Sequence, residues 1–134
     1  MFHKIYKPKL TIVYMYSLPQ EIEVWYIIPA IRKELATALT TKHGLNFEKA
    51  GDILGVSKAA VSQYLSKKRA NRVKIPEAIR KEIEKSADII IRDNKKVVDE
   101  IQRLVILMKV KKSYCSVCKK YNPLILKFCH NEKC

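Results

Sequence analysis

Residues 50–65 read Ala-Gly-Asp-Ile-Leu-Gly-Val-Ser-Lys-Ala-Ala-Val-Ser-Gln-Tyr-Leu, and this stretch decides how the chain is expected to fold. The pattern predicts two short helices that meet at a tight turn. Asn46 and Ser57 are suited to cap them, since their side chains accept hydrogen bonds from unpaired backbone amides. Gly55 can adopt the left-handed conformation that reverses the chain. Gly51 is small enough to let the two helices approach closely.

The second helix is predicted to have one apolar and one polar face. Val61 and Leu65 are four residues apart and should face the core, with Ile53 and Leu54 as the opposing surface. Tyr64 is expected to be half-buried. The side chains left for solvent are Lys58, Ala59, Ser62, Gln63 and Ser66.

These solvent-facing residues are of the types that contact DNA. Glutamine pairs with adenine, lysine pairs with guanine, and an alanine methyl contacts the methyl group of thymine. The basic residues that follow are expected to contact phosphates, which position a protein without specifying sequence. The predicted DNA-binding residues are Ser57, Lys58, Ala59, Ser62, Gln63, Ser66, Lys67, Lys68, Arg69 and Arg72.

The charge of the chain agrees with a polyanionic partner. Lysine and arginine number 27 against 13 acidic residues, a net charge of +14. Residues 44–76 hold 7 of the basic and 2 of the acidic residues, so they carry +5. Such an excess favours encounter with DNA, RNA or an anionic membrane surface.

Residues 45–69 resemble the XRE-type helix-turn-helix regulators, the lambda-repressor/Cro-like class. The resemblance rests on Leu-Gly-Val-Ser at 54–57 and Ala-Val-Ser-Gln-Tyr-Leu-Ser at 60–66. Residues 18–36 also resemble the lead-in of archaeal predicted transcriptional regulators, so the resemblance covers roughly residues 18–92. It implies a mainly α fold that binds double-stranded DNA. Gly51 departs from the alanine usual in that family.

Four segments are expected along the chain. They are a basic, β-prone arm at 1–16, a DNA-binding domain at 17–75, a helical support or dimerisation region at 76–112 and a cysteine-rich tail at 113–134. In the second segment, Pro29 is predicted to start a helix that ends at Gly44. In the third, Pro76 is predicted to open a helix and Asp93-Asn94 to interrupt it.

Two apolar stripes at helical spacing mark that third segment. The first comprises Ile79, Ile83, Ala87 and Ile90. The second comprises Val97, Val98, Ile101, Leu104, Val105 and Met108. The second stripe is broad enough to predict a homodimer, which would set two recognition helices about 34 Å apart on DNA. The alternative is packing against residues 18–28 of the same chain.

All four cysteines fall in the tail, as Cys115-x2-Cys118-x10-Cys129-x4-Cys134. A C-x2-C turn with a second pair nearby predicts a four-thiolate metal site. Zn²⁺ is the first choice, because the tail resembles a small zinc ribbon. The wide second spacing leaves an iron–sulfur cluster as an alternative. Disulfides, or His130 in place of one cysteine, are further alternatives.

No catalytic constellation or phosphate-binding loop is recognisable, so the chain is not expected to be an enzyme. Without a convincing secretory signal or a spanning segment, a cytoplasmic location is expected. Two other functions compete with transcriptional regulation. One is an RNA- or ribosome-associated zinc-ribbon protein, and the other is an antitoxin-like interaction module.

Overall fold

A computed structural model describes residues 18–70, 73–111 and 113–121 of the chain. This described part is mainly helical, as the sequence predicts, and it contains no strand. The predicted arm at 1–16 lies outside it. The elements are α2 (Pro19–Ile22), the π-helical η1 (Glu23–Ile27), α3 (Ile28–Thr41), α4 (Phe47–Leu54), α5 (Lys58–Leu65), α6 (Glu77–Arg92), the 3-10 helix η2 (Asn94–Lys96), α7 (Val97–Val110) and α8 (Ser113–Tyr121).

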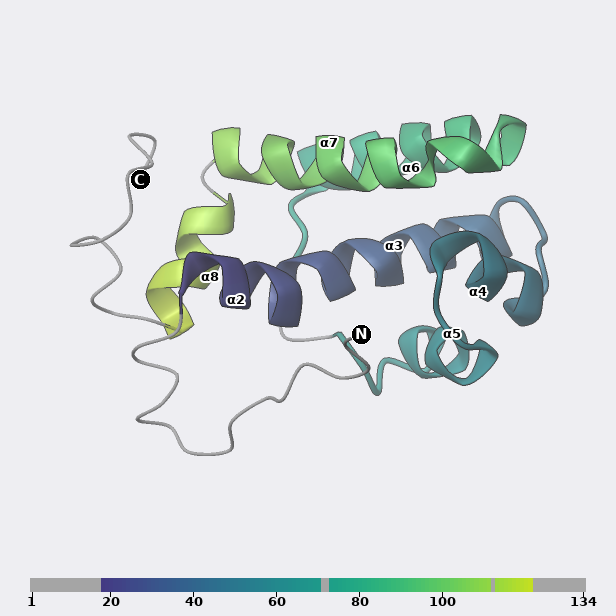
Figure 1. Ribbon diagram of the computed structural model, residues 1–134, viewed down its shortest axis with the longest axis horizontal. Coiled ribbons are helices and arrows are strands. Elements are labelled where there is room, and N and C mark those ends of the chain that lie inside the picture. Colours follow the sequence, from purple (N-terminus) through teal and green to yellow (C-terminus); the bar gives the residue numbers. More distant parts are fainter. Residues whose placement is uncertain (1–17, 71–72, 112, 122–134) are drawn as a thin grey trace.

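The elements α2, η1 and α3 follow one another without a break and form one long helix (Figure 1). The backbone N–H of Ile28 donates to the carbonyl of Glu23, five residues earlier, which is the π pattern. Pro29 follows directly, and a proline has no N–H and crowds the carbonyl four residues before it. Widening the preceding turn is one way for a helix to pass a proline. Pro29 therefore stands in the first turn of α3 but does not separate two helices.

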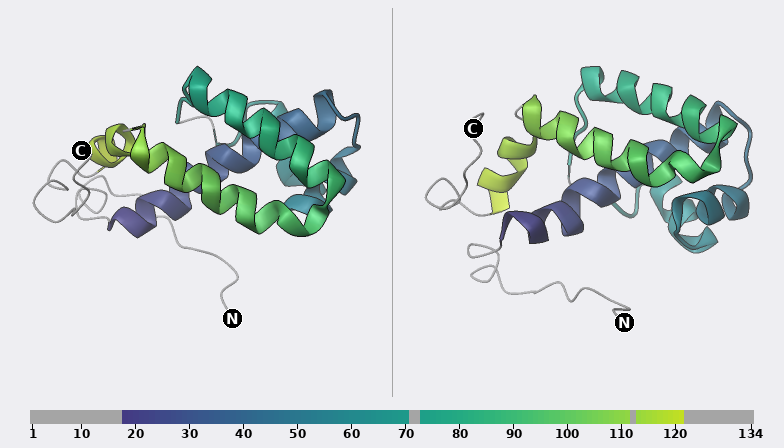
Figure 2. Two further views of the ribbon diagram at one scale, coloured as in Figure 1. Left: turned by 90° about the horizontal axis from the view of Figure 1, so that it is seen from above. Right: turned by 45° about the horizontal axis from the view of Figure 1, so that its top comes forward.

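The long helix lies between two layers. Figure 1 shows α4 and α5 below α3 and α6 and α7 above it, and α8 beside α2 at the other end. In both views of Figure 2, α6 and α7 run side by side on one side of α3. On α3, Ile31, Leu35 and Leu39 recur at helical spacing and are all buried. The core is continuous from Ile22 on α2 to Cys118 on α8.

The α6–α7 pair begins and turns where the sequence predicts. Pro76 immediately precedes α6, and the side chain of Asp93 accepts a hydrogen bond of 3.1 Å from the backbone N–H of Lys95 in the turn. The first apolar stripe is buried throughout. In the second stripe, Leu104 and Met108 are buried within the chain, whereas Val98 is 61% exposed. Most of that stripe therefore already has a partner in its own chain.

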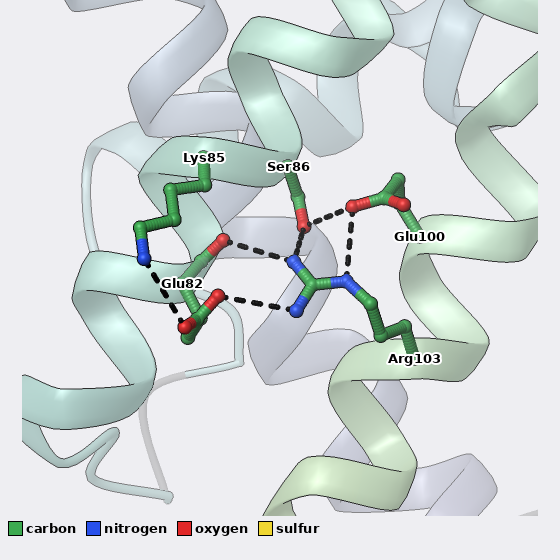
Figure 3. A network of polar contacts seen from close by, with 5 residues as sticks. All are labelled: Glu82, Lys85, Ser86, Glu100 and Arg103. Carbon is green, nitrogen blue, oxygen red and sulfur yellow. Dashed lines mark hydrogen bonds and ion pairs between the residues drawn. The ribbon is translucent and has the colours of Figure 1, made fainter.

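A polar network joins α6 to α7 (Figure 3). The hydroxyl of Ser86, fully buried, donates to Glu100 Oε1 at 2.7 Å. The guanidinium of Arg103 donates to Ser86 Oγ at 2.8 Å, to Glu100 Oε1 at 3.2 Å and to Glu82 Oε2 at 3.1 Å. The hydrogen bond from Arg103 lowers the pKa of Glu82 below its ordinary value. The buried carboxylate of Glu100 is thus compensated by the Arg103 cation and the Ser86 hydroxyl.

Candidate functional site

The junction between α4 and α5 has the caps and the turn that the sequence predicts. Asn46 Oδ1 accepts from the backbone N–H of Lys49 at 2.7 Å, at the start of α4. Ser57 Oγ accepts from the backbone N–H of Ala60 at 3.0 Å, at the start of α5. Gly55 ends α4 in the left-handed conformation with φ of 73°. Both helices therefore begin and end through local interactions.

Gly51 permits the close approach at this junction. A Cβ built on Gly51 would lie 2.6 Å from the backbone carbonyl oxygen of Val56. The backbone N–H of Val56 also donates to the carbonyl of Gly51 at 2.9 Å. The obstacle to a larger residue is backbone, which relaxes less readily than a side chain. The predicted need for a small residue is confirmed.

One face of α5 is anchored in the core. Val61 is fully buried, and Ala60 and Tyr64 are nearly so. Tyr64 is more deeply buried than the sequence predicts, because it lies one turn beyond Ala60 and shares that inward face. The partly buried Leu65 and Ile53 pack against the same core. This anchoring decides which side chains of α5 remain outside.

The opposite face of α5 carries the predicted contact residues. Ser57, Lys58, Ala59, Ser62 and Ser66 are all exposed. Gln63 is only partly buried and lies at the border between the two faces. The structure thus brings the six residues predicted for this helix and its cap onto one side of a short, anchored helix.

The three basic residues Lys67, Lys68 and Arg69 are exposed in the turn after α5, outside the helix itself. Backbone N–H groups of Lys67 and Lys68 donate to the carbonyls of Tyr64 and Gln63, at 3.1 and 2.9 Å. This is the Schellman pattern, whose left-handed position glycine usually occupies. Here Lys67 occupies it with φ of 61°. Arg72, also predicted to contact DNA, lies outside the described residues.

A cavity of about 610 Å³ adjoins this face, which the sequence does not predict. Lys58 and Leu65 of α5 line it together with Phe47 of α4 and Thr40 and Thr41 of α3. Phe47 is the first residue of α4 and is about one-third exposed. In the sequence, the only sign of this cavity is an apolar residue, Phe47, directly after the Asn46 cap. The exposed face of α5 therefore borders a hollow with an apolar edge.

The two cysteines in the described part lie on α8 rather than in the predicted turn. Cys115 and Cys118 are both buried, and their spacing places them on the same side of the helix. Cys115 is disulfide-bonded in the structure. Among the described residues, no three histidine, cysteine or acidic side chains form a group that could hold a metal. Cys129, His130 and Cys134 lie outside the described residues.

The helix that carries these cysteines is docked through Tyr114. The Tyr114 hydroxyl lies 2.8 Å from Glu23 Oε2 and 3.1 Å from the carbonyl oxygen of Pro19. Lys109 pairs with Glu23 at 3.4 Å, and its ammonium lies 5.1 Å from the centre of the Tyr114 ring. The sequence does not predict these contacts. They place the first part of the tail in the core with α2, η1 and α7.

Within the ranges that the structure describes, no helix is both long enough and apolar enough to cross a membrane. Comparisons of the chain with protein-family models, with curated proteins and with solved structures find no match.

Proposed function

We propose that this chain is a sequence-specific, DNA-binding transcriptional regulator whose α4–α5 unit is a helix-turn-helix. In that motif the second helix lies in the major groove. The observation that carries the proposal is the division of α5 into a buried face, around Val61, and an exposed face of Lys58, Ala59 and Ser62. A helix held in this way presents polar groups at fixed positions to a ligand.

The charge around α5 supports an anionic ligand. No acidic residue occurs between Asp52 and Glu77, whereas Lys67, Lys68 and Arg69 follow the helix directly. The three basic side chains are exposed, so phosphates can approach them from solvent. Phosphate contacts of this kind supply affinity in a salt-dependent manner. In this proposal they set the position of α5 along the duplex.

Specificity is assigned to Lys58, Ser62 and Gln63. Side chains of these types form hydrogen bonds with base edges in the major groove. Gln63 lies at the edge of the exposed face, where a long amide side chain can extend toward a base. Each well-formed pair contributes about 1–3 kcal/mol of discrimination against the wrong base.

The test begins with selection of preferred sequences from randomised double-stranded DNA. Binding of the selected duplex and of a scrambled duplex is then measured for the wild type and for Gln63→Ala. We expect the variant to lose about 1–3 kcal/mol on the selected duplex and little on the scrambled one. Lys95→Ala is the matched control, because Lys95 is exposed in η2, between α6 and α7. Figure 1 shows α6 and α7 on the other side of α3 from α5.

Selection that enriches no sequence would refute the proposal, as would equal binding of the two duplexes by wild type and variant. Tighter, salt-sensitive binding to RNA than to any duplex would instead favour an RNA-associated role. The salt dependence of binding distinguishes residues that contact phosphates from residues that contact bases. Lys68→Ala is expected to weaken binding to both duplexes and to make the dependence on salt less steep.

We further propose that the regulator is a homodimer formed through the outer face of α7. Val98, Ile106 and Val110 are each more than half exposed on that helix. The helix has two acidic and two basic residues, so it adds no net charge of its own in a chain of net charge +14. Ile106→Asp should convert the dimer to a monomer in light scattering after gel filtration. A wild-type monomer at micromolar concentration would refute this assignment.

The tail is proposed to hold a metal through Cys115, Cys118, Cys129 and Cys134. Support comes from the spacing of the two cysteines on α8, which places them on one side of a helix docked by Tyr114. Metal binding requires the reduced form, because Cys115 is disulfide-bonded in the structure and the metal ligand is a thiolate. Bound Zn²⁺ would stabilise a segment with little apolar area of its own, whereas an iron–sulfur cluster would add redox chemistry. Elemental analysis and an optical spectrum of protein purified without oxygen distinguish them. Protein that contains neither metal, with its thiols oxidised in pairs, would refute both.

A further inference from the structure

A second cavity, of about 400 Å³, lies between residues 73–76, the connector that precedes α6, and the start of α8. Its volume falls in the range of small-molecule sites, about 300–1,000 Å³. Lysines from three separate segments line it: Lys74 of the connector, Lys111 after α7 and Lys120 of α8. No acidic side chain is part of the described lining. Convergence of positive charge on one hollow favours an anionic ligand.

Within the part of the chain that the structure describes, two of these lysines have no ion pair. Among the described residues, no carboxylate pairs with Lys74 or Lys111, and both side chains are exposed. The hydroxyl groups of Ser113 and Ser116 add hydrogen-bond donors to the lining. Oxygen atoms of a phosphate accept hydrogen bonds from ammonium and hydroxyl groups alike. The polar half of the cavity therefore matches a phosphate group.

The remaining lining is apolar. Val73, Pro76 and Val117 complete the cavity. On α8, Ser113, Ser116, Val117 and Lys120 recur at helical spacing and form one face, whereas Cys115 and Cys118 are buried on another. A ligand in the cavity would contact the connector and α8 together without displacing the cysteines.

We propose that this cavity binds a small phosphate-bearing molecule, with its phosphate between Lys74 and Lys111 and an apolar part against Val117. Backbone phosphates of DNA have the same chemistry. A small molecule fits better, because α8 lies near α2, at the opposite end of the long helix from α4 and α5 (Figure 1). The site does not depend on the proposed function of α5.

Binding is tested with the full chain by calorimetric titration of inorganic phosphate and of ATP at constant ionic strength. The wild type should bind both, and ATP should bind more tightly because it adds charge and apolar contact. Lys74→Ala and Lys111→Ala are each expected to weaken binding at least tenfold. Lys119→Ala is the matched control, because Lys119 is exposed on α8 next to Lys120 and does not line the cavity. It should bind within twofold of the wild type.

Circular dichroism melting confirms that each variant is folded before it is titrated. Equal weakening by all three substitutions would overturn the proposal, because it would show attraction to net charge alone. Wild-type binding by Lys74→Ala and Lys111→Ala would also overturn it. A third measurement separates the sources of phosphate. If these two substitutions weaken binding to a random DNA duplex more than Lys119→Ala does and leave ATP binding unchanged, the lysines serve DNA instead.

Discussion

The two layers on either side of α3 are held in different ways. The helices α6 and α7 bury aliphatic side chains along their length and are joined by Arg103 and its partners. The helices α4 and α5 are shorter and depend on two caps, one glycine contact and a few buried residues. The long pair therefore supplies stability, while the short pair leaves polar side chains outside. Five predictions test this division, from the largest expected effect to the smallest.

Ile83→Ala should have the largest effect on stability. Ile83 is buried on α6, and truncation of such a residue costs about 2–5 kcal/mol through lost burial and a new cavity. Chemical denaturation measures the free energy of unfolding. Lys81→Ala on the exposed side of α6 is the control and should change it by no more than about 0.5 kcal/mol. Val61→Ala on α5 removes fewer atoms. If it lowered the free energy of unfolding more than Ile83→Ala does, stability would not come mainly from α6 and α7.

Arg103→Ala should cost about 1–3 kcal/mol, because it leaves the buried carboxylate of Glu100 without its cation. Combination with Glu100→Gln should recover part of the loss, since the unpaired charge is then absent. A double-mutant cycle on unfolding free energies measures this coupling. Additive effects of the two substitutions would show that the ion pair contributes nothing to joining α6 and α7.

Gly51→Ala tests the short pair. The new methyl would meet the Val56 carbonyl, and relief of this overlap is expected to cost about 1–3 kcal/mol. Alanine recovers up to about 1 kcal/mol through its higher helix propensity, so the net destabilisation should be modest. Asp52 is the next residue and is exposed, so Asp52→Ala introduces alanine, with its higher helix propensity, where no such overlap arises. A Gly51→Ala variant more stable than Asp52→Ala would show that the junction is loosely packed.

Lys67→Gly should raise stability and lower DNA affinity at once. Glycine adopts the left-handed conformation of this position without the Cβ penalty, a gain of up to about 1 kcal/mol. Loss of the cation should weaken binding to every duplex to a similar extent. Melting temperature and duplex titrations are the two measurements. Unchanged DNA binding would remove Lys67 from the proposed phosphate contacts.

The smallest expected effect is on the stability of the fold at acid pH. Arg103 lowers the pKa of Glu82 in the folded chain, so this carboxylate stabilises the fold above the ordinary glutamate pKa of about 4.3. The contribution should decline as the pH falls through the lowered pKa. Glu82→Gln should therefore reduce stability at neutral pH and flatten its loss in acid. Parallel pH profiles for variant and wild type would contradict this linkage.

Local signals predict much of the described structure. Asn46, Gly55 and Ser57 act on their immediate neighbours, so their roles are visible in the sequence. Contacts between distant residues are not visible in this way. Nothing local indicates that Tyr114 meets Glu23, or that Arg103 meets Glu82.

Periodicity also left ambiguities. The stripe at 97–108 predicts an apolar face but does not say whether the partner is the same chain or another. The structure buries Leu104 and Met108 in the chain and leaves Val98 exposed. A cysteine pair spaced as a metal-binding turn is likewise compatible with a helix, and α8 is one. Spacing alone therefore does not determine the backbone conformation of Cys115 and Cys118.

The π turn at Glu23–Ile27 has a consequence for insertions and deletions. A π turn holds one residue more than an α turn, so deletion of one residue there would leave an ordinary helix. The segments on either side would keep their relative orientation, because the wider turn already accommodates the extra residue. Insertion of one residue into the regular helix after this turn would instead rotate everything before it by about 100° relative to α3, the angle per residue of an α-helix. Pro19 and Glu23 would then turn away from Tyr114. The π turn is therefore the point at which this helix can lose one residue while α8 keeps its docking partners.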